Sequence, residues 1–198
     1  MSYIGPNATV SGTASVRDNA TVSDNATVSG TAIVGGNAIV GGNAFVTDDA
    51  TVTDDARVTD DATVTDDARV TDNATVTDSA IVTDNARVTD NASVRDNATV
   101  SDNATVTDSA IVTDNAIVRG TMVIDRSPMT VTRSDGYTFL YAPCADGIWR
   151  VSAGCRYFTM EEAETHWSET RGDTPLGQET MIILIALGAW RLLCEEQS

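Results

Sequence analysis

The stretch Ala44-Phe45-Val46-Thr47-Asp48-Asp49-Ala50-Thr51-Val52 shows the six-residue repeat that decides the fold of this chain. Valine occupies every sixth position from Val10 to Val118, and alanine stands two places before each of these valines, through nineteen hexads without an exception. A period of six is neither the helical period nor the simple alternation of an ordinary strand, so the chain returns to one direction every six residues. Such a repeat predicts a solenoid.

Within each hexad the residues predict one short strand and one corner. Side chains alternate along a strand, so alanine and valine, two places apart, face inward while the residue between them faces outward. That outer position varies, with Thr9, Phe45 and Arg57 among its occupants. Segments such as Thr-Asp-Asn and Gly-Gly-Asn follow the valines, and their residues tolerate left-handed backbone angles. Three hexads would close a triangular coil of eighteen residues, which gives about six coils.

The repeat resembles the left-handed parallel β-helix of the hexapeptide-repeat superfamily, in which an aliphatic residue is followed four places later by a small one. Val10 and Ala14, and then Val16 and Ala20, fit this signature, and the fit continues through the repeat. The resemblance implies a left-handed coil and a three-fold association of subunits. We therefore expect a mostly β chain, with a left-handed parallel β-helix over residues 1–124 and a small α+β domain over residues 125–198.

The second domain is expected to contain a β-hairpin and two helices. Aromatic and β-branched runs at residues 137–141 and 148–151 flank Asp146-Gly147, which is a hairpin signal. A capping-box pattern predicts a helix from near Met160, and Thr174-Pro175 predicts the start of a second helix. This order of elements loosely resembles that of YdcK-like hexapeptide proteins of enteric bacteria and their phages. That resemblance implies a bacterial or phage setting and a transferase label that rests on the β-helix.

The second predicted helix contains the run Met181–Trp190, ten residues without a charge. Such a run is too short to span a bilayer comfortably, so we expect a buried helix and no membrane association. A hairpin and one short helix cannot cover all its sides. The remaining side is expected to form an interface between subunits, most simply in a homotrimer.

Known enzymes of the superfamily are mostly acyltransferases, and the resemblance implies a histidine base on a coil together with an inserted loop. Residues 1–124 contain no histidine, no lysine and no inserted loop. Aspartate at its ordinary pKa is a poor general base. The sequence therefore assigns no catalytic residue to the repeat and favours a non-catalytic protein. The one catalytic candidate is His166, the only histidine of the chain, which lies four residues after Glu162 on the first predicted helix.

The net charge of −17 is concentrated in the repeat, where 18 aspartates and 5 arginines lie within residues 1–118. Three interpretations stay open. The corner aspartates are solubilising turn residues, or they imitate the phosphates of DNA, or they bind cations along the columns. Direct binding of nucleic acid by this acidic segment is disfavoured. The candidate metal ligands are one column of corner residues, Asp48, Asp66, Asp84 and Asp102.

Arg133, Arg150 and Arg156 are candidates for holding an anionic ligand in a cleft between subunits. Three cysteines without zinc-like spacing and the absence of a signal peptide favour a reducing, bacterial cytoplasmic setting. The sequence indicates no cofactor.

Three functions are compatible with these observations. The first is a non-catalytic interaction or structural protein, a homotrimer whose acidic rod binds a protein partner. The second is a phage-type inhibitor that imitates DNA or sequesters a small anionic signalling molecule at a subunit interface. The third is an acyl-CoA-dependent acyltransferase whose active site lies between subunits.

Overall fold

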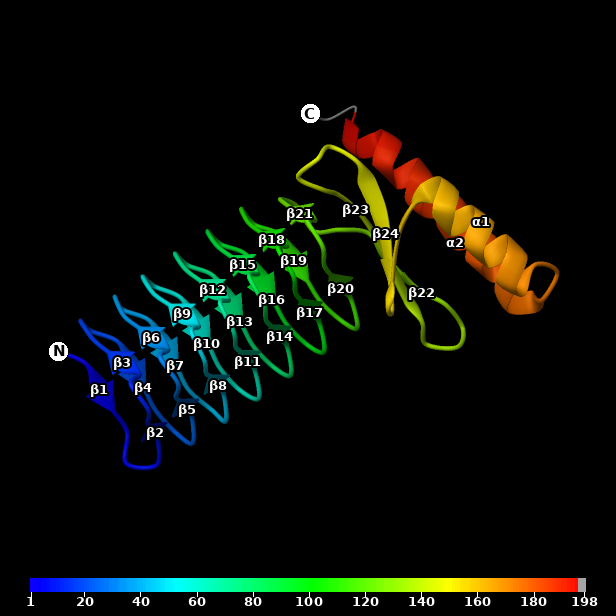
Figure 1. Cartoon of the computed structure of the whole chain (residues 1–198). Helices are drawn as coiled ribbons and strands as arrows, with labels where there is room; N and C mark the ends of the chain where they lie inside the picture. Colours follow the sequence, from blue (N-terminus) through cyan, green and yellow to red (C-terminus); the bar gives the residue numbers. More distant parts are fainter. Residues whose placement is uncertain (196–198) are drawn as a thin grey trace.

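The computed structural model describes residues 1–195 and shows a long shaft of stacked coils with a smaller cap at its C-terminal end (Figure 1). Each coil of the shaft contributes three two-residue strands, and these strands form three parallel sheets of seven strands each. Strand partners are eighteen residues apart, as in the pairing of Arg69 with Thr51 and with Arg87. The predicted parallel solenoid with three hexads per coil is therefore confirmed.

The strands of the shaft are named in chain order. One sheet contains β1 (Tyr3–Ile4), β4 (Thr21–Val22), β7 (Ile39–Val40), β10 (Arg57–Val58), β13 (Thr75–Val76), β16 (Ser93–Val94) and β19 (Ile111–Val112). The second contains β2 (Thr9–Val10), β5 (Thr27–Val28), β8 (Phe45–Val46), β11 (Thr63–Val64), β14 (Ile81–Val82), β17 (Thr99–Val100) and β20 (Ile117–Val118). The third contains β3 (Ser15–Val16), β6 (Ile33–Val34), β9 (Thr51–Val52), β12 (Arg69–Val70), β15 (Arg87–Val88), β18 (Thr105–Val106) and β21 (Val123–Ile124).

The shaft has seven coils, where the sequence predicted about six. Strands β1 and β21 extend it with hexads in which Ile4 and Ile124 occupy the valine position. The valine count therefore underestimates the length. From Ala20 to Val118 every inward alanine and valine is at most 1% exposed, so side chains fill the interior of the shaft.

The corners of the shaft are tight turns with left-handed backbone angles. In a typical corner the Ala50 N–H donates to the Thr47 carbonyl at 3.2 Å, and Asp48 between them has a φ of 59°. Fourteen aspartates share this conformation, with φ between 56° and 64°. Aspartate accepts it because its short polar side chain can form local hydrogen bonds.

The cap contains an antiparallel four-stranded sheet and two helices. Its strands are β22 (Thr130–Thr132), β23 (Thr138–Pro143), β24 (Trp149–Ala153) and β25 (Arg156–Thr159), and they pair in that order. The helices are α1 (Met160–Arg171) and α2 (Pro175–Glu195). The predicted hairpin is β23 and β24, and it gains a further strand on each side. Thr159 forms the predicted capping box with Glu162 at the start of α1.

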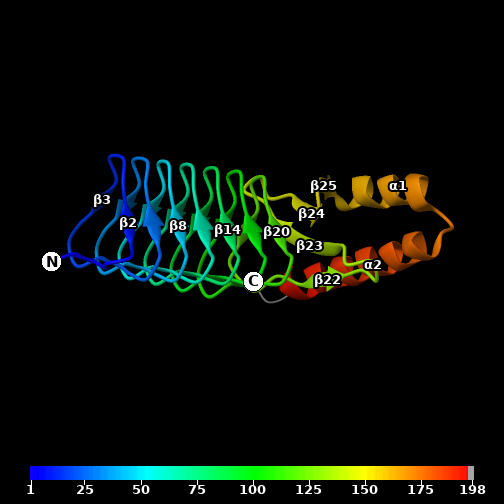
Figure 2. The ribbon, with the colours of Figure 1, turned by 90° about the horizontal axis from the view of Figure 1, so that it is seen from below.

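The cap sheet lies between the end of the shaft and the two helices, and Figure 2 shows both helices extending away from the coils. Strand β23 alternates its side chains between these neighbours. Leu140 and Ala142 join the core of the shaft, whereas Phe139 and Tyr141 pack with α1 and α2 in a second core. The cap thus covers the apolar end of the last coil. The division into domains after residue 124 stays a prediction, because one core runs across it.

Candidate functional site

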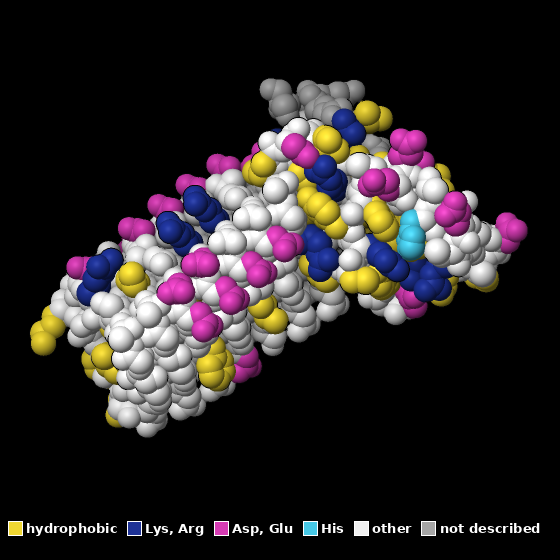
Figure 3. All heavy atoms as spheres, in the orientation of Figure 1, with side chains coloured by type: hydrophobic (Ala, Val, Ile, Leu, Met, Phe, Trp, Pro, Cys, Tyr) yellow, Lys and Arg dark blue, Asp and Glu magenta, His cyan; other side chains and the backbone are white. Residues whose placement is uncertain are grey.

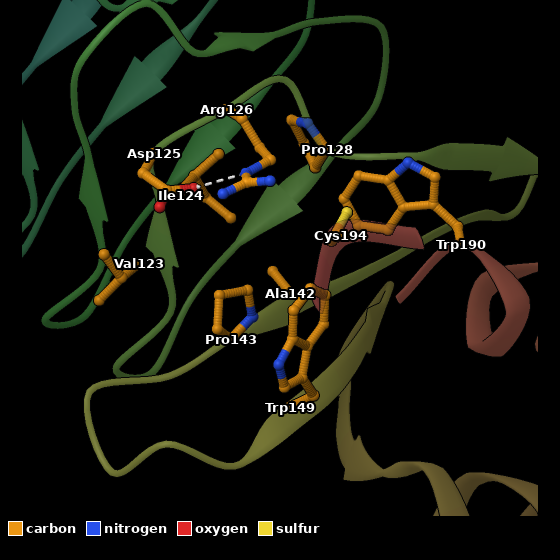
Figure 4. A pocket seen from close by; sticks show the side chains of 10 residues that line it. All are labelled: Val123, Ile124, Asp125, Arg126, Pro128, Ala142, Pro143, Trp149, Trp190 and Cys194. Carbon is orange, nitrogen blue, oxygen red and sulfur yellow. Dashed lines mark hydrogen bonds and ion pairs between the residues drawn. The ribbon is translucent and has the colours of Figure 1, made fainter. Parts of the chain in front are cut away.

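A pocket of about 300 Å³ lies where the last coil of the shaft meets the cap (Figure 4). We call it the junction pocket. Its walls come from β21 and the segment after it, from β23 and β24, and from the C-terminal half of α2. The lining residues are Val123, Ile124, Asp125, Arg126, Pro128, Ala142, Pro143, Trp149, Trp190 and Cys194.

Two indole rings form much of the apolar wall of this pocket. Trp149 stands at the start of β24, opposite Pro143 of β23, and packs against Tyr141 with ring centroids 5.3 Å apart. Trp190 approaches from α2, and its ring meets that of Trp149 edge to face at 6.0 Å. The Arg191 guanidinium lies 5.6 Å from the Trp149 ring and supports it from the same helix. The wall is therefore held in place by contacts from two strands and a helix.

An ion pair provides polar groups in the pocket wall. The Arg126 side chain donates from Nε to the Asp125 carboxylate at 3.3 Å, and both side chains are about half exposed. Figure 4 shows this pair on the wall opposite Trp149 and near Pro128. An apolar cavity with a few convergent polar groups is the usual form of a small-molecule site.

The three arginines proposed as anion ligands occupy different environments. Arg133 is only 2% exposed, and it donates to Asp135 and to the Thr180 hydroxyl, so its guanidinium ties the β22–β23 turn to α2. Arg150 makes a two-pronged ion pair with Asp146 at 2.9 and 2.7 Å. Arg156 is exposed on β25. The strand pairing puts Arg150 and Arg156 on opposite faces of the sheet, so the structure does not gather the three around one anion.

His166 lies on α1, beside a shallow hollow that includes Glu161, Glu162 and Glu169. Its ring packs against that of Phe158, with centroids 5.0 Å apart. Glu162 lines the same hollow, as the four-residue spacing suggested, but its carboxylate accepts from the Thr159 N–H at 2.8 Å. That hydrogen bond lowers the pKa of Glu162. The carboxylate is thus committed to the helix cap.

The candidate metal column of the shaft is occupied by internal hydrogen bonds. The Asp48 carboxylate accepts from the hydroxyls of Thr65 and Thr47, which lower its pKa. The Asp84 carboxylate accepts from the Asp102 N–H at 3.2 Å, and that of Asp102 accepts from the Gly120 N–H at 2.9 Å. Across residues 1–195 no group of three or more His, Cys, Asp or Glu side chains is arranged to hold a metal ion. Figure 3 shows the resulting rows of carboxylates along the shaft.

The three cysteines of the described cap form no disulfide, and their surroundings differ. Cys144 is buried at the junction, where its Sγ lies 3.0 Å from the Tyr157 hydroxyl. Cys194 lines the junction pocket, and Cys155 is exposed.

Sequence reasoning did not find the junction pocket. Its lining residues extend from Val123 to Cys194 along the chain, and no local motif unites them. The available signal was the pair Trp149 and Trp190, two of only three tryptophans in the chain.

The fold defines a parallel β-solenoid of the hexapeptide-repeat type with a C-terminal α+β cap. A family model described as GMPPB C-terminal domain matches residues 22–131. The match covers more than half of the chain, and the chain belongs to this family. No curated protein matches the sequence.

Several solved structures are similar in fold. An acetyltransferase domain of PglB from Neisseria gonorrhoeae is 18% identical with a TM-score of 0.44, over 61% of this chain and 52% of that one. A variant of GDP-perosamine N-acetyl transferase from Caulobacter crescentus, in complex with CoA and GDP-perosamine, is 14% identical with a TM-score of 0.43, over 60% and 50%. A hexapeptide transferase family protein from Anaplasma phagocytophilum is 13% identical with a TM-score of 0.48, over 96% and 92%. The chain thus covers about half the length of the two acetyltransferase structures.

Proposed function

We propose that the cap carries the function of this protein and that the junction pocket binds a small ligand. The observation that supports this proposal is the pocket of about 300 Å³ with two tryptophans in its wall, next to a shaft whose interior is filled by alanine and valine. In this proposal the shaft is a rigid scaffold that holds the cap in an oligomer.

The pocket favours a ligand with a flat apolar part and one polar edge. Trp149 and Trp190 offer aromatic surface against which a ring or an acyl chain can pack. Asp125 and Arg126 offer an acceptor and a donor to the polar edge. Acetyl-CoA and a nucleotide sugar are suitable first probes, since CoA, acetyl coenzyme A and GDP-perosamine are the ligands named for the similar acetyltransferase structures.

Tryptophan fluorescence tests this proposal with a matched control. Titration of the full chain with each probe should change the emission of the pocket tryptophans, and Trp190→Phe should reduce the response at least by half. Trp167→Phe should leave it intact, because Trp167 is buried between Phe139 and Phe158 and does not line the pocket. No response to any probe, or an equal loss in both variants, would count against the pocket as a ligand site.

Acyl transfer is the second candidate, and it requires a base in the cap. His166 is the only histidine and lies in a hollow with acidic neighbours, and acetyltransferase is the activity that the names of two similar structures state. In this reading the imidazole of His166 takes a proton from an acceptor amine or hydroxyl while that group attacks the thioester carbonyl, and the CoA thiolate leaves. Release of free CoA from acetyl-CoA in the presence of amino-sugar acceptors should then be abolished by His166→Ala. A turnover unchanged by that substitution would exclude His166 as the base.

The expected non-catalytic role stays a proposal beside this one, and the names of similar structures favour a transferase instead. We further propose a homotrimer in a bacterial cytoplasm, with the shafts providing the anionic surface that a protein partner would meet. DNA mimicry, sequestration of an anion and a phage or enteric setting stay proposals of the same standing. A chain mass by light scattering that equals a monomer would reject the trimer.

A further inference from the structure

The outer face of α2 carries a regular apolar stripe. Ile182, Ile185 and Leu192 are 67%, 68% and 61% exposed, and Ala189 between them is exposed as well. Gln178, also exposed, precedes Ile182 by four residues, so steps of four and three alternate along the whole face. This alternation is the heptad spacing of a helix that packs along another helix. We call these five residues the α2 stripe.

The opposite face fixes the orientation of the helix. Ile183, Leu184 and Leu187 are at most 4% exposed and belong to the core of the cap. At the start of the helix the Thr180 hydroxyl accepts from Arg133 at 2.8 Å, and Glu179 accepts from Ser134. Because these contacts fix the helix, the α2 stripe cannot rotate into the cap's own core.

The charge of the chain restricts what can cover the stripe. Arg191 is the only charged residue between Glu179 and Glu195, in a chain with a net charge of −17. Two copies of the chain repel each other through their acidic shafts. The electrostatic free energy of association is therefore least unfavourable when the two copies meet through this uncharged face. Small side chains at Gly188 and Ala189 would let two helices come close. By length and composition alone α2 could also cross a bilayer. However, its buried face is part of the cap core, and an anionic lipid surface repels so acidic a protein.

We infer that the α2 stripe packs against the α2 stripe of a second copy of this chain. The inference rests on the oligomer proposed above and names the surface that forms it. The alternative is an interface on the faces of the shaft, where isoleucines are also exposed.

The test measures the mass of the full chain by light scattering over a hundredfold range of concentration. The double substitution Ile182→Asn with Ile185→Asn should raise the dissociation constant at least tenfold and give monomers at micromolar concentration. The matched control replaces Ile81 and Ile111 by asparagine, since these shaft residues are 41% and 40% exposed. The control should keep the mass of the unmodified chain.

Each outcome decides a different point. If only the shaft substitutions dissociated the oligomer, the α2 interface would be overturned, whereas the proposal that the chain forms an oligomer would still hold. A monomeric unmodified chain would overturn both. Co-sedimentation of the unmodified chain with phosphatidylcholine–phosphatidylglycerol vesicles, lost on α2 substitution, would make a membrane the occupant and also overturn the inference.

A second measurement covers the case in which the double variant does not fold. Ile185→Cys should give disulfide-linked dimers on mild oxidation, because one added thiol per chain forms one disulfide, and their yield should exceed the background from Cys155, which is exposed in the unmodified chain. Ile111→Cys should not exceed that background. Equal crosslinking of the two would overturn the inference.

Discussion

The interior of the shaft makes a quantitative prediction about Val70. This residue lies on β12, is 0% exposed, and stacks between Val52 and Val88 of the neighbouring coils. Val70→Ala removes two methyl groups, worth about 0.8 kcal/mol each in transfer free energy. The surrounding backbone is fixed by hydrogen bonds on both sides, so the cavity left by the methyl groups should collapse little. The total loss of unfolding free energy should therefore be about 2–3 kcal/mol.

Val10→Ala, near the N-terminal end of the shaft, is the matched control for the central Val70. Val10 is only half-buried and has a neighbouring coil on one side, where it pairs with Val28. We expect this substitution to cost less than about 1 kcal/mol, because much of the side chain already contacts water.

Urea unfolding followed by circular dichroism and by tryptophan fluorescence provides the assay. Far-UV circular dichroism reports the strands of the shaft together with the helices and sheet of the cap, whereas fluorescence reports the cap alone, because all three tryptophans lie there. Repeat proteins can lose two-state behaviour, so agreement of the two signals must be checked before free energies are compared. Equal costs for the two substitutions, or a cost below about 0.5 kcal/mol for Val70→Ala, would refute a close-packed interior.

Three further predictions concern the corners and the cap. Threonine hydroxyls lower the folded-state pKa of a set of corner carboxylates. The stabilisation that these carboxylates contribute is therefore present above the ordinary aspartate pKa of 3.8 and is lost as the pH falls through their lower folded-state pKa. Acid titration followed by circular dichroism should show this loss, and a shaft equally stable at pH 2 and pH 6 would contradict the prediction. The set is Asp48, Asp60, Asp90 and Asp96. Gly120→Ala should lower the unfolding free energy by about 1–3 kcal/mol, because its Cβ would lie 2.5 Å from the Tyr157 ring, whereas Gly136→Ala, with a positive φ and open space, should cost less. Thr159→Ala should cost about 1 kcal/mol by removing the cap of α1, and thermal unfolding that is unchanged would argue against the capping box.

The shaft could be predicted from the sequence because one short rule repeats nineteen times. The repeat specifies inward residues and corner residues independently of the rest of the chain. It underestimates the shaft only at its two ends, where Ile4 and Ile124 replace the repeated valine and the seventh coil is completed. Left and right coils share the same period, so the hand came from the family resemblance alone.

The cap was harder to predict, because its structure depends on contacts between distant segments. Strand β22 has only three residues and follows Pro128, and its pairing with β23 is what makes it a strand. The apolar run of α2 predicted burial, and the structure buries one side while leaving Ile182 and Ile185 open. The junction pocket exists only because α2 brings Trp190 back against Trp149 of β24. A contact between two residues so far apart in the chain leaves no periodic pattern in the sequence.

The acidity of the shaft has a structural cause that precedes any functional one. Fourteen of its aspartates occupy corner positions with left-handed φ, where most other side chains would be strained. Glycine would meet the backbone requirement, as Gly36 and Gly42 do, but it offers no side-chain acceptor to the next coil. The Asp90 carboxylate accepts from the Thr107 hydroxyl of the next coil at 2.6 Å, so the charged residue links consecutive coils. A negative shaft therefore follows from building corners with aspartate, and charge alone does not distinguish a DNA mimic from a scaffold. Salt-sensitive binding to a DNA-handling enzyme would make that distinction, because counterion-dependent attraction is not expected of a scaffold.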